Sequence, residues 1–281
     1  MSQKSIASCP LISFRALQAA KENCEIDTWR CVTDVQNARL STLRTAYKYT
    51  QHSLLEIEHI RISETSDLKQ HQKFLKSLNM TSAVKKGKDW DIFLAGAFHI
   101  LPIWSHFGVP TPIHIKDIGT FAGIHISNDC MKAYRSMSGD KYYILKTVDG
   151  NDIHITCTKI APKNSQDLWD YANHVDYWKD EIPCNGLILP LIDLVTCTSE
   201  DWMNGIFGAS PYQGPIHTVK ECLEKTRVRW TDEGVKRSLL LRNELHTPEL
   251  ITKPFFVMQY MKNATVPLFS AYVNYDSWRK A

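Results

Sequence analysis

The stretch KPFFVMQY, residues 253–260, is followed closely by VPLFSAYVN, residues 266–274, and these two segments decide the fold. Both are rich in aromatic and β-branched residues, which favour β-strands. The residues between them include the polar stretch KNAT at 262–265, which is typical of a turn. We therefore expect residues 253–260 and 266–274 to form two neighbouring strands joined by a turn.

Further strand signals lie upstream. Residues 91–98 (DIFLAGAF) form a continuous apolar run with a small centre, which predicts a central strand covered on both faces. Asp149-Gly150 stands between two apolar segments, 142–148 and 152–160, and this arrangement predicts a β-hairpin. Residues 54–62 alternate between apolar and polar from Leu55 onward, which predicts a half-buried strand.

Helical patterns dominate the first part of the chain. Residues 10–49 carry two amphipathic runs, and residues 66–78 predict a short helix with Ser66 as its N-cap. Further helices are expected at 165–177 and, as a short piece, around 199–207. Because helices come first and strands dominate later, the sequence predicts an α+β fold.

The composition is that of a globular protein. Of the 281 residues, 43% are hydrophobic and 22% are charged, which argues against disorder. No Gly- or Pro-rich linker and no internal repeat divides the chain, so we expect residues 1–281 to form one domain. The 33 basic residues are scattered among 30 acidic ones, and the net charge of +3 gives no reason to expect nucleic-acid binding.

The sequence carries no recognisable catalytic constellation. It lacks the G-x-S-x-G elbow, the P-loop, the G-x-G-x-x-G fingerprint and H-E-x-x-H. His114, His125 and His154 lie on expected strands and could meet at a metal, but isolated strand histidines are more often structural. We therefore expect no catalytic residues, no cofactor and no metal site.

Cysteines and the N-terminus bear on the compartment. The chain has eight cysteines without a CxxC pair or a zinc-finger spacing. No apolar stretch has the length of a signal peptide or a membrane span, so we expect free thiols packed in the core. The expected location is inside a cell, a host cell included, or in a virus particle.

The C-terminal pair of strands resembles the last two strands of the serpin superfamily, where a basic-Pro-Phe strand and a Leu-Phe-x-x-x-Val-Asn strand form a buried hairpin. Residues 224–234 (EKTRVRWTDEG) are similar to the serpin strand that ends in an acidic-Glu-Gly hinge, here Glu233-Gly234. Residues 94–98 with Trp104 resemble the family's Asn-Ala and Trp signature, and residues 9–17 resemble its Ser-Pro-x-Ser start. The resemblance covers most of the chain in the same order.

This resemblance implies a serpin-like fold: a large central, mainly antiparallel β-sheet, smaller β-sheets and a reduced set of surrounding helices. Serpins open their central sheet at a polar network of Ser, Asn and His. The matching positions here are Cys9 or Ile12, Gly96 and Glu224, so we expect that network to be absent. The helix that crosses the sheet in the family would fall between Val84 and Trp90, where there is no room for it.

An inhibitory serpin offers a long loop as bait and then inserts the cleaved loop as a new strand. The segment after Gly234 contains Lys236, Arg237 and Arg242, and burying one such charge unpaired would cost several kcal/mol. Nineteen residues, 235–253, separate Gly234 from Pro254, which is short for an inhibitory loop.

Three interpretations follow. The first is a non-inhibitory serpin-like scaffold that binds a protein partner or has a structural or host-interaction role. A viral origin would suit so reduced a serpin. The second is a serine or cysteine protease inhibitor with a reactive loop at about 235–250, in which Arg242 or Glu249 is the recognised residue. The third is an unrecognised enzyme. Residues 232–234 also fit an ordinary hairpin turn.

Overall fold

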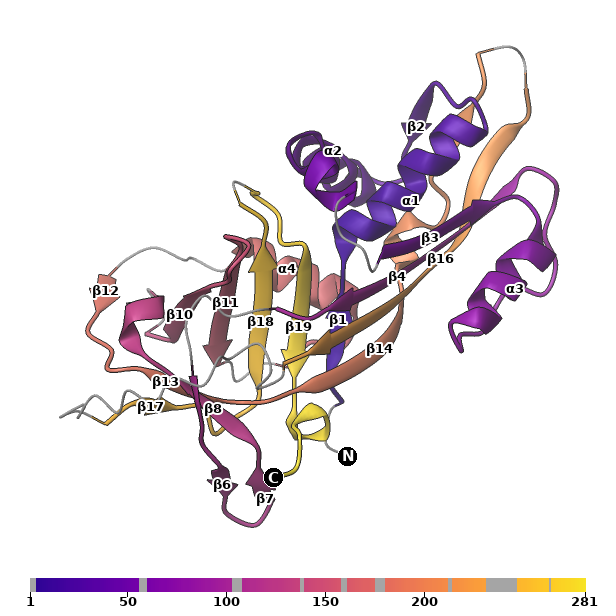
Figure 1. Cartoon of the computed structure of the whole chain (residues 1–281). Coiled ribbons are helices and arrows are strands. Elements are labelled where there is room, and N and C mark those ends of the chain that lie inside the picture. The colour runs from indigo at the N-terminus through magenta and orange to yellow at the C-terminus, as the bar shows by residue number, and fades with distance from the viewer. Residues whose placement is uncertain are drawn as a thin grey trace.

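The computed structural model describes residues 4–55, 60–102, 108–136, 139–157, 161–174, 180–211, 214–230, 247–262 and 264–281. Within these residues the chain forms four helices and four β-sheets, which is the expected α+β class with few helices. Figure 1 shows helices α1 and α2 above a long twisted sheet, with α3 at its far side and a second large sheet beside it.

The second large sheet contains the C-terminal pair. Its strand order is β1-β19-β18-β11-β10-β9-β12, and every pairing is antiparallel. The strands are β1 (Ile6–Ser8), β9 (Met131–Arg135), β10 (Lys141–Lys146), β11 (Asp152–Cys157), β12 (Asp180–Ile182), β18 (Phe255–Tyr260) and β19 (Phe269–Val273).

Two strand predictions are confirmed in this sheet. The terminal pair β18 and β19 is antiparallel and almost entirely buried, as its apolar composition requires. Strands β10 and β11 form the expected hairpin. Gly150 has a φ of 79° at its turn, a backbone conformation that favours glycine.

The six-stranded sheet is the central sheet, against which α1 and α3 pack. Its order is β2-β15-β16-β4-β3, and β14 also pairs with β16. Its strands are β2 (Thr28–Arg30), β3 (Ile60–Thr65), β4 (Asp91–Ile100), β14 (Asp193–Ser199), β15 (Phe207–Ala209) and β16 (Ile216–Arg229). Only β4 and β16 run parallel within the described part of this sheet. The prediction of a central strand at 91–98, covered on both faces, is confirmed by β4.

Two small sheets complete the strand set. One joins β5 (Gly108–Pro110), β8 (Gly123–Ile126), β13 (Leu187–Pro190) and β17 (Glu249–Leu250), and the other pairs β6 (Ile113–Ile115) with β7 (Gly119–Phe121). Single 3-10 turns occur at η1 (Asn128–Cys130), η2 (Asp201–Met203) and η3 (Tyr275–Ser277).

The helices cover the sheets by their apolar sides. Helix α1 (Pro10–Asn23) packs on β3 and β4, and α2 (Asp34–Leu55) packs on α1. Helix α3 (Leu68–Ser77) contacts β3 and β4, where its Leu75 joins Ala95 and Ala97 in a buried cluster. Helix α4 (Ser165–His174) packs on β1 and β19.

Several predicted boundaries are wrong. Leu54 and Leu55 end α2, and strand β3 begins only at Ile60, because a short apolar run fits a buried helix end as well as a strand. The N-cap of α3 is Asp67, whose carboxylate accepts from the amides of Lys69 and Gln70, and not Ser66. The two amphipathic runs predicted within residues 10–49 are α1 and α2, but the second begins only at Asp34, because Trp29 lies in strand β2.

Two further helix predictions need adjustment. The expected helix around 199–207 is only the turn η2, after which β15 begins. The expected helix at 165–177 is α4, which is described to His174, and residues 175–179 lie outside the described residues.

The contact between α1 and the central sheet depends on Gly96. A Cβ at this position would lie 2.9 Å from Cγ2 of Ile12, closer than carbon atoms pack. Ile12 is fully buried between α1 and the sheet. Glycine at position 96 therefore lets α1 approach β4.

We expect Gly96→Ala to lower the free energy of unfolding by roughly 1–3 kcal/mol, because the added methyl overpacks the contact with Ile12. In an Ile12→Ala background the same change should cost clearly less, because the clashing atom is gone. Urea unfolding of the four proteins measures this coupling. An equal cost in both backgrounds would contradict the proposed contact.

Candidate functional site

The position singled out for sheet opening is the junction of β4 and β16. Gly96 on β4 and Glu224 on β16 are direct partners in the parallel ladder. Trp104, the third residue predicted there, lies outside the described residues. Two of the three predicted sheet-opening residues are therefore adjacent in space.

Glu224 is a fully buried carboxylate that joins β16 to α1. It accepts hydrogen bonds from the Cys9 amide at 2.5 Å, from the Ser13 hydroxyl at 2.9 Å and from the Thr226 hydroxyl at 2.8 Å. Cys9 is the N-cap of α1 and provides no side-chain cap of its own. The carboxylate thus lies at the start of a helix, where negative charge is stabilised.

A second buried carboxylate lies close to the first along the N-terminal strand. Glu200 is 2% exposed and accepts from the hydroxyl of Ser8 at 2.8 Å and from the indole N–H of Trp202 at 3.0 Å. Ser8 and Cys9 are consecutive, so neighbouring residues hold the two acids. Burial, together with the negative charge of Glu224, raises the pKa of Glu200 to about 8.

The pKa of Glu224 is also raised, chiefly by burial, although hydrogen bonds from Thr226, Ser13 and Cys9 oppose this effect. Two carboxylates in one buried region repel each other when both are ionised. Burial and this repulsion both favour the protonated form of one member of the pair. Of the residues matched to the family's Ser, Asn and His, Glu224 accepts a hydrogen bond from Cys9, and Ser13 and Thr226 complete its contacts.

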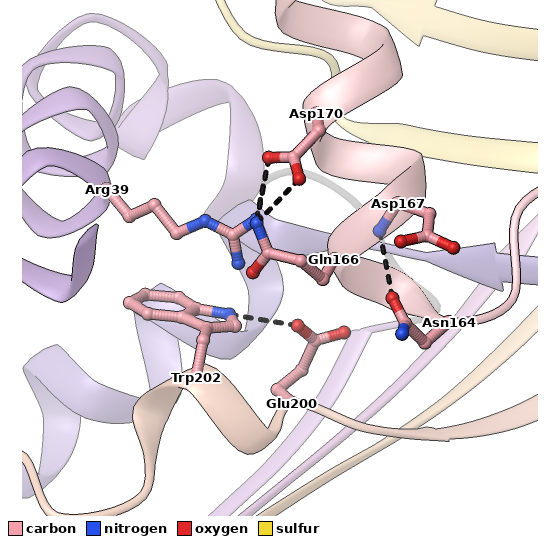
Figure 2. A network of polar contacts seen from close by, with 7 residues as sticks. All are labelled: Arg39, Asn164, Gln166, Asp167, Asp170, Glu200 and Trp202. Atoms are coloured by element: carbon pink, nitrogen blue, oxygen red, sulfur yellow. Dashed lines mark hydrogen bonds and ion pairs between the residues drawn. The ribbon is translucent and has the colours of Figure 1, made fainter.

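Arg39 of α2 borders Glu200 and connects helices that are far apart in sequence. Its guanidinium lies over Trp169 and Trp202, at 5.1 Å and 5.5 Å from the ring centroids, and 3.5 Å from the Asp170 carboxylate. Figure 2 shows Arg39 reaching Asp170, with Trp202 and Glu200 beneath it. The positive charge of Arg39 lowers the pKa of Glu200 slightly, against the larger effect of burial.

Sequence reasoning did not identify Glu200 or Arg39 as part of a site. Glu200 directly follows β14, and Arg39 lies in a long amphipathic helix among other charged residues. No motif marks either of them. Their burial arises only where α2, α4 and η2 meet.

The opposite face of β16 is held by α3 and the residues after it. Glu221 accepts from Nε2 of His71 and from the amide of Ala83, both at 2.9 Å. Lys225 donates to the carbonyl oxygen of Leu78 at 2.6 Å. Burial alone would raise the pKa of Glu221, but the hydrogen bonds it accepts hold it below its usual value.

The predicted helix at 66–78 is present as α3, and it lies on the sheet although residues 84–90 leave no room for the family's crossing helix. It covers that face from an earlier position in the chain. The buried side chains Leu75 and Leu78 contact Ala95 and Ala97 of β4. The small alanines allow the helix to lie close to the strand.

The residues proposed for a reactive loop are only partly described. Glu233, Gly234 and Arg242 lie outside the described residues. Glu249 lies in β17, and its carboxylate accepts from the Lys141 ammonium at 2.5 Å and 2.7 Å and from the Tyr143 hydroxyl at 2.9 Å. Glu249 is therefore attached to the seven-stranded sheet.

The strand histidines have separate partners. Nδ1 of His114 is 2.8 Å from the Thr120 hydroxyl, and Nδ1 of His154 is 2.8 Å from the Tyr142 hydroxyl. Burial lowers the pKa of His154 to about 4. Among the described residues no group of three His, Cys, Asp or Glu side chains is placed to hold a metal ion.

All eight cysteines are free thiols, and three of them (Cys9, Cys130 and Cys222) are buried. In the described part of the chain, no helix has the length and apolar character needed to cross a membrane.

The acidic pair makes stability depend on pH. The pKa of Glu200 is higher in the folded state than its ordinary value of 4.5, so the folded protein binds an extra proton between about pH 4.5 and pH 8. Stability is therefore expected to fall as pH rises through this range, by several kcal/mol at most. Glu200→Gln should flatten this dependence, because the amide does not ionise.

Urea unfolding between pH 5 and pH 8.5 measures the effect, with Glu181→Gln at an exposed position as the matched control. The control should keep the wild-type slope. If Glu200→Gln shows that same slope, the buried acid does not hold the extra proton.

No family model matches the sequence, and no curated protein matches it. The chain is nevertheless similar to solved structures of serpins. The serpin of Schistosoma mansoni gives a TM-score of 0.61 at 12% identity, with 96% of this chain and 95% of that chain covered.

The serpin of the trematode Schistosoma haematobium gives a TM-score of 0.57 at 14% identity, covering 96% and 93% of the two chains. The serine protease inhibitor (serpin) 12 of Manduca sexta gives 0.55 at 10% identity, covering 100% and 95%. These structures are similar to this one over nearly the whole chain, and the chain therefore has a serpin-like fold.

Proposed function

We propose that this protein is a non-catalytic, non-inhibitory serpin-like scaffold that acts by binding a protein partner. The observation that carries the proposal is the attachment of β16 on both of its faces. Glu224 joins the strand to α1, while Glu221 and Lys225 join it to α3 and the residues that follow. A sheet held in this way resists the insertion of another strand.

The topology explains which contacts insertion would break. Strand β16 already has β14 on one edge and β4 on the other, and its ladder with β4 extends from Thr218 to Val228. A loop that follows β16 can pair with β16 itself only after β16 separates from one of these neighbours. Separation from β4 would move Glu224 away from Gly96 and strain its bonds to α1.

The composition of the loop adds to this resistance. Alternate side chains of an inserted strand turn toward the buried face of the sheet. Over residues 235–242, this alternation buries Lys236, Arg242 or Arg237, according to the register. An unpaired buried charge costs several kcal/mol, which the gain from one new strand would have to exceed.

The far end of the segment is also held. Glu249 pairs with Lys141 and Tyr143, and β17 lies parallel to β13. Glu249 is therefore poorly placed to serve as the residue that a protease recognises. Its contacts favour a structural role at the end of the segment.

The proposal extends to where the protein acts. A scaffold of this kind fits a host-interaction or structural role, inside a cell or in a virus particle, with a protein as its partner. The location rests on the cysteine pattern and the apolar stretches of the sequence, and the role rests on the missing catalytic motifs.

Cleavage within residues 235–246 tests the proposal. Trypsin-like proteases cut after Arg237 or Arg242, and thermal melting then compares the nicked protein with the intact one. We expect an unchanged or lower melting temperature and no protease complex that survives denaturing electrophoresis. The control is a synthetic peptide of residues 235–250 added to the intact protein, which should not raise the melting temperature either.

The alternative function, inhibition of a serine or cysteine protease, predicts opposite results. Insertion of the cut loop would raise the melting temperature strongly, and a covalent complex with the protease would form. Either result would overturn the proposal and assign the recognised bond to the 235–250 segment. The fold similarity to the Manduca sexta inhibitor is the reason to include this comparison.

A further inference from the structure

The outer side of α2 carries an uncharged stripe. Its members are spaced alternately three and four residues apart, and each is exposed: Val35, Ala38, Thr42, Thr45 and Tyr49. Val35 is 59% exposed and Tyr49 is 76% exposed. Residues at this spacing share one face of a helix.

The stripe is separate from the side of α2 that packs into the protein. Leu40, Leu43 and Ala46 face the core and are at most 2% exposed. The hydroxyls of Thr42 and Thr45 are bonded to the carbonyl oxygens of Ala38 and Ser41, at 3.0 Å and 3.1 Å. These bonds satisfy the polar atoms and leave the threonine methyl groups free to make apolar contacts.

Spacing of three and four residues is the a and d pattern by which helices pair. A second row, Asp34, Ser41 and Lys48, borders the stripe at intervals of seven residues. This row has a negative charge at one end and a positive charge at the other. In the described part of the chain neither Asp34 nor Lys48 forms an ion pair.

The charges select the orientation of a second copy. If two α2 helices pair antiparallel about a two-fold axis near Ser41, each Asp34 lies beside the other copy's Lys48. A parallel pair would instead place Asp34 beside Asp34 and Lys48 beside Lys48. The charge pattern of the row is thus self-complementary only in the antiparallel arrangement.

The apolar residues fit the same arrangement. The small residues Ala38 and Thr42 lie at the crossing point, where they allow two helices to approach closely. Tyr49 of one copy then reaches the end of the other α2 near Val35 and the exposed Val32. We propose that α2 pairs antiparallel with α2 of a second copy of this chain through this stripe.

One helix pair covers less area than a standard stable interface, so the dimer is expected to be weak and concentration-dependent. Sedimentation equilibrium of the full chain over a range of concentrations, in reducing buffer, measures the association. Asp34→Lys and Lys48→Asp should each weaken it about tenfold or more, because like charges then meet. The double variant D34K/K48D should restore it.

Arg44→Asp is the matched control, since Arg44 is exposed on the same helix but outside both rows. It should leave association close to that of the wild type. Melting temperature and circular dichroism show whether each variant is folded. A wild-type protein that stays monomeric at every concentration, or a double variant no stronger than the single ones, would overturn the proposal.

A cross-link provides a measurement that does not depend on charge. Ser41→Cys places a thiol near the two-fold axis, so mild oxidation should form a disulfide between the two copies at position 41. Digestion and mass spectrometry then identify the disulfide-linked peptide. Arg44→Cys should give much less of the corresponding product. Equal yields from the two variants would contradict the antiparallel register.

Discussion

The buried carboxylate of Glu224 is the interaction on which the architecture depends. It lies on the central strand β16, opposite Gly96, and receives hydrogen bonds from the first residues of α1. A charge in this place requires donors, and the helix start supplies them. Helix α1 is thereby fixed over β4, where Gly96 leaves room for Ile12.

On its other face, the same strand is held to α3 and the residues after it by hydrogen bonds and apolar contacts. Glu221 and Lys225 hold the segment that includes α3, and the apolar contacts of Leu75 with Ala95 and Ala97 fill the space between helix and sheet. Because attachments on both faces act on one strand, movement of β16 disturbs α1 and α3 together. This coupling is the basis of our proposal that the sheet does not take up a further strand.

The acidic pair adds a dependence on protonation. Glu200 and Glu224 are held by consecutive residues, and burial favours the neutral form of each. Arg39, held by Trp169, Trp202 and Asp170, supplies a positive charge nearby. The two buried acids are thus stabilised by donors from β1, α1 and β16 and by the positive charge of Arg39 on α2.

The sequence predicted the strands β4, β10, β11, β18 and β19, because long apolar runs and an Asp-Gly turn leave few alternatives. The serpin resemblance came from the C-terminal pair together with residues 224–234, 94–98 and 9–17. It placed Gly96 and Glu224 in one region. The sequence misjudged the start of residues 54–62, since a short apolar run fits a helix end as well as a strand, and it predicted α3 with Ser66 in place of Asp67 as the N-cap. Tertiary structure alone decided the burial of Glu200 and Arg39, because their environment comes from segments more than a hundred residues apart.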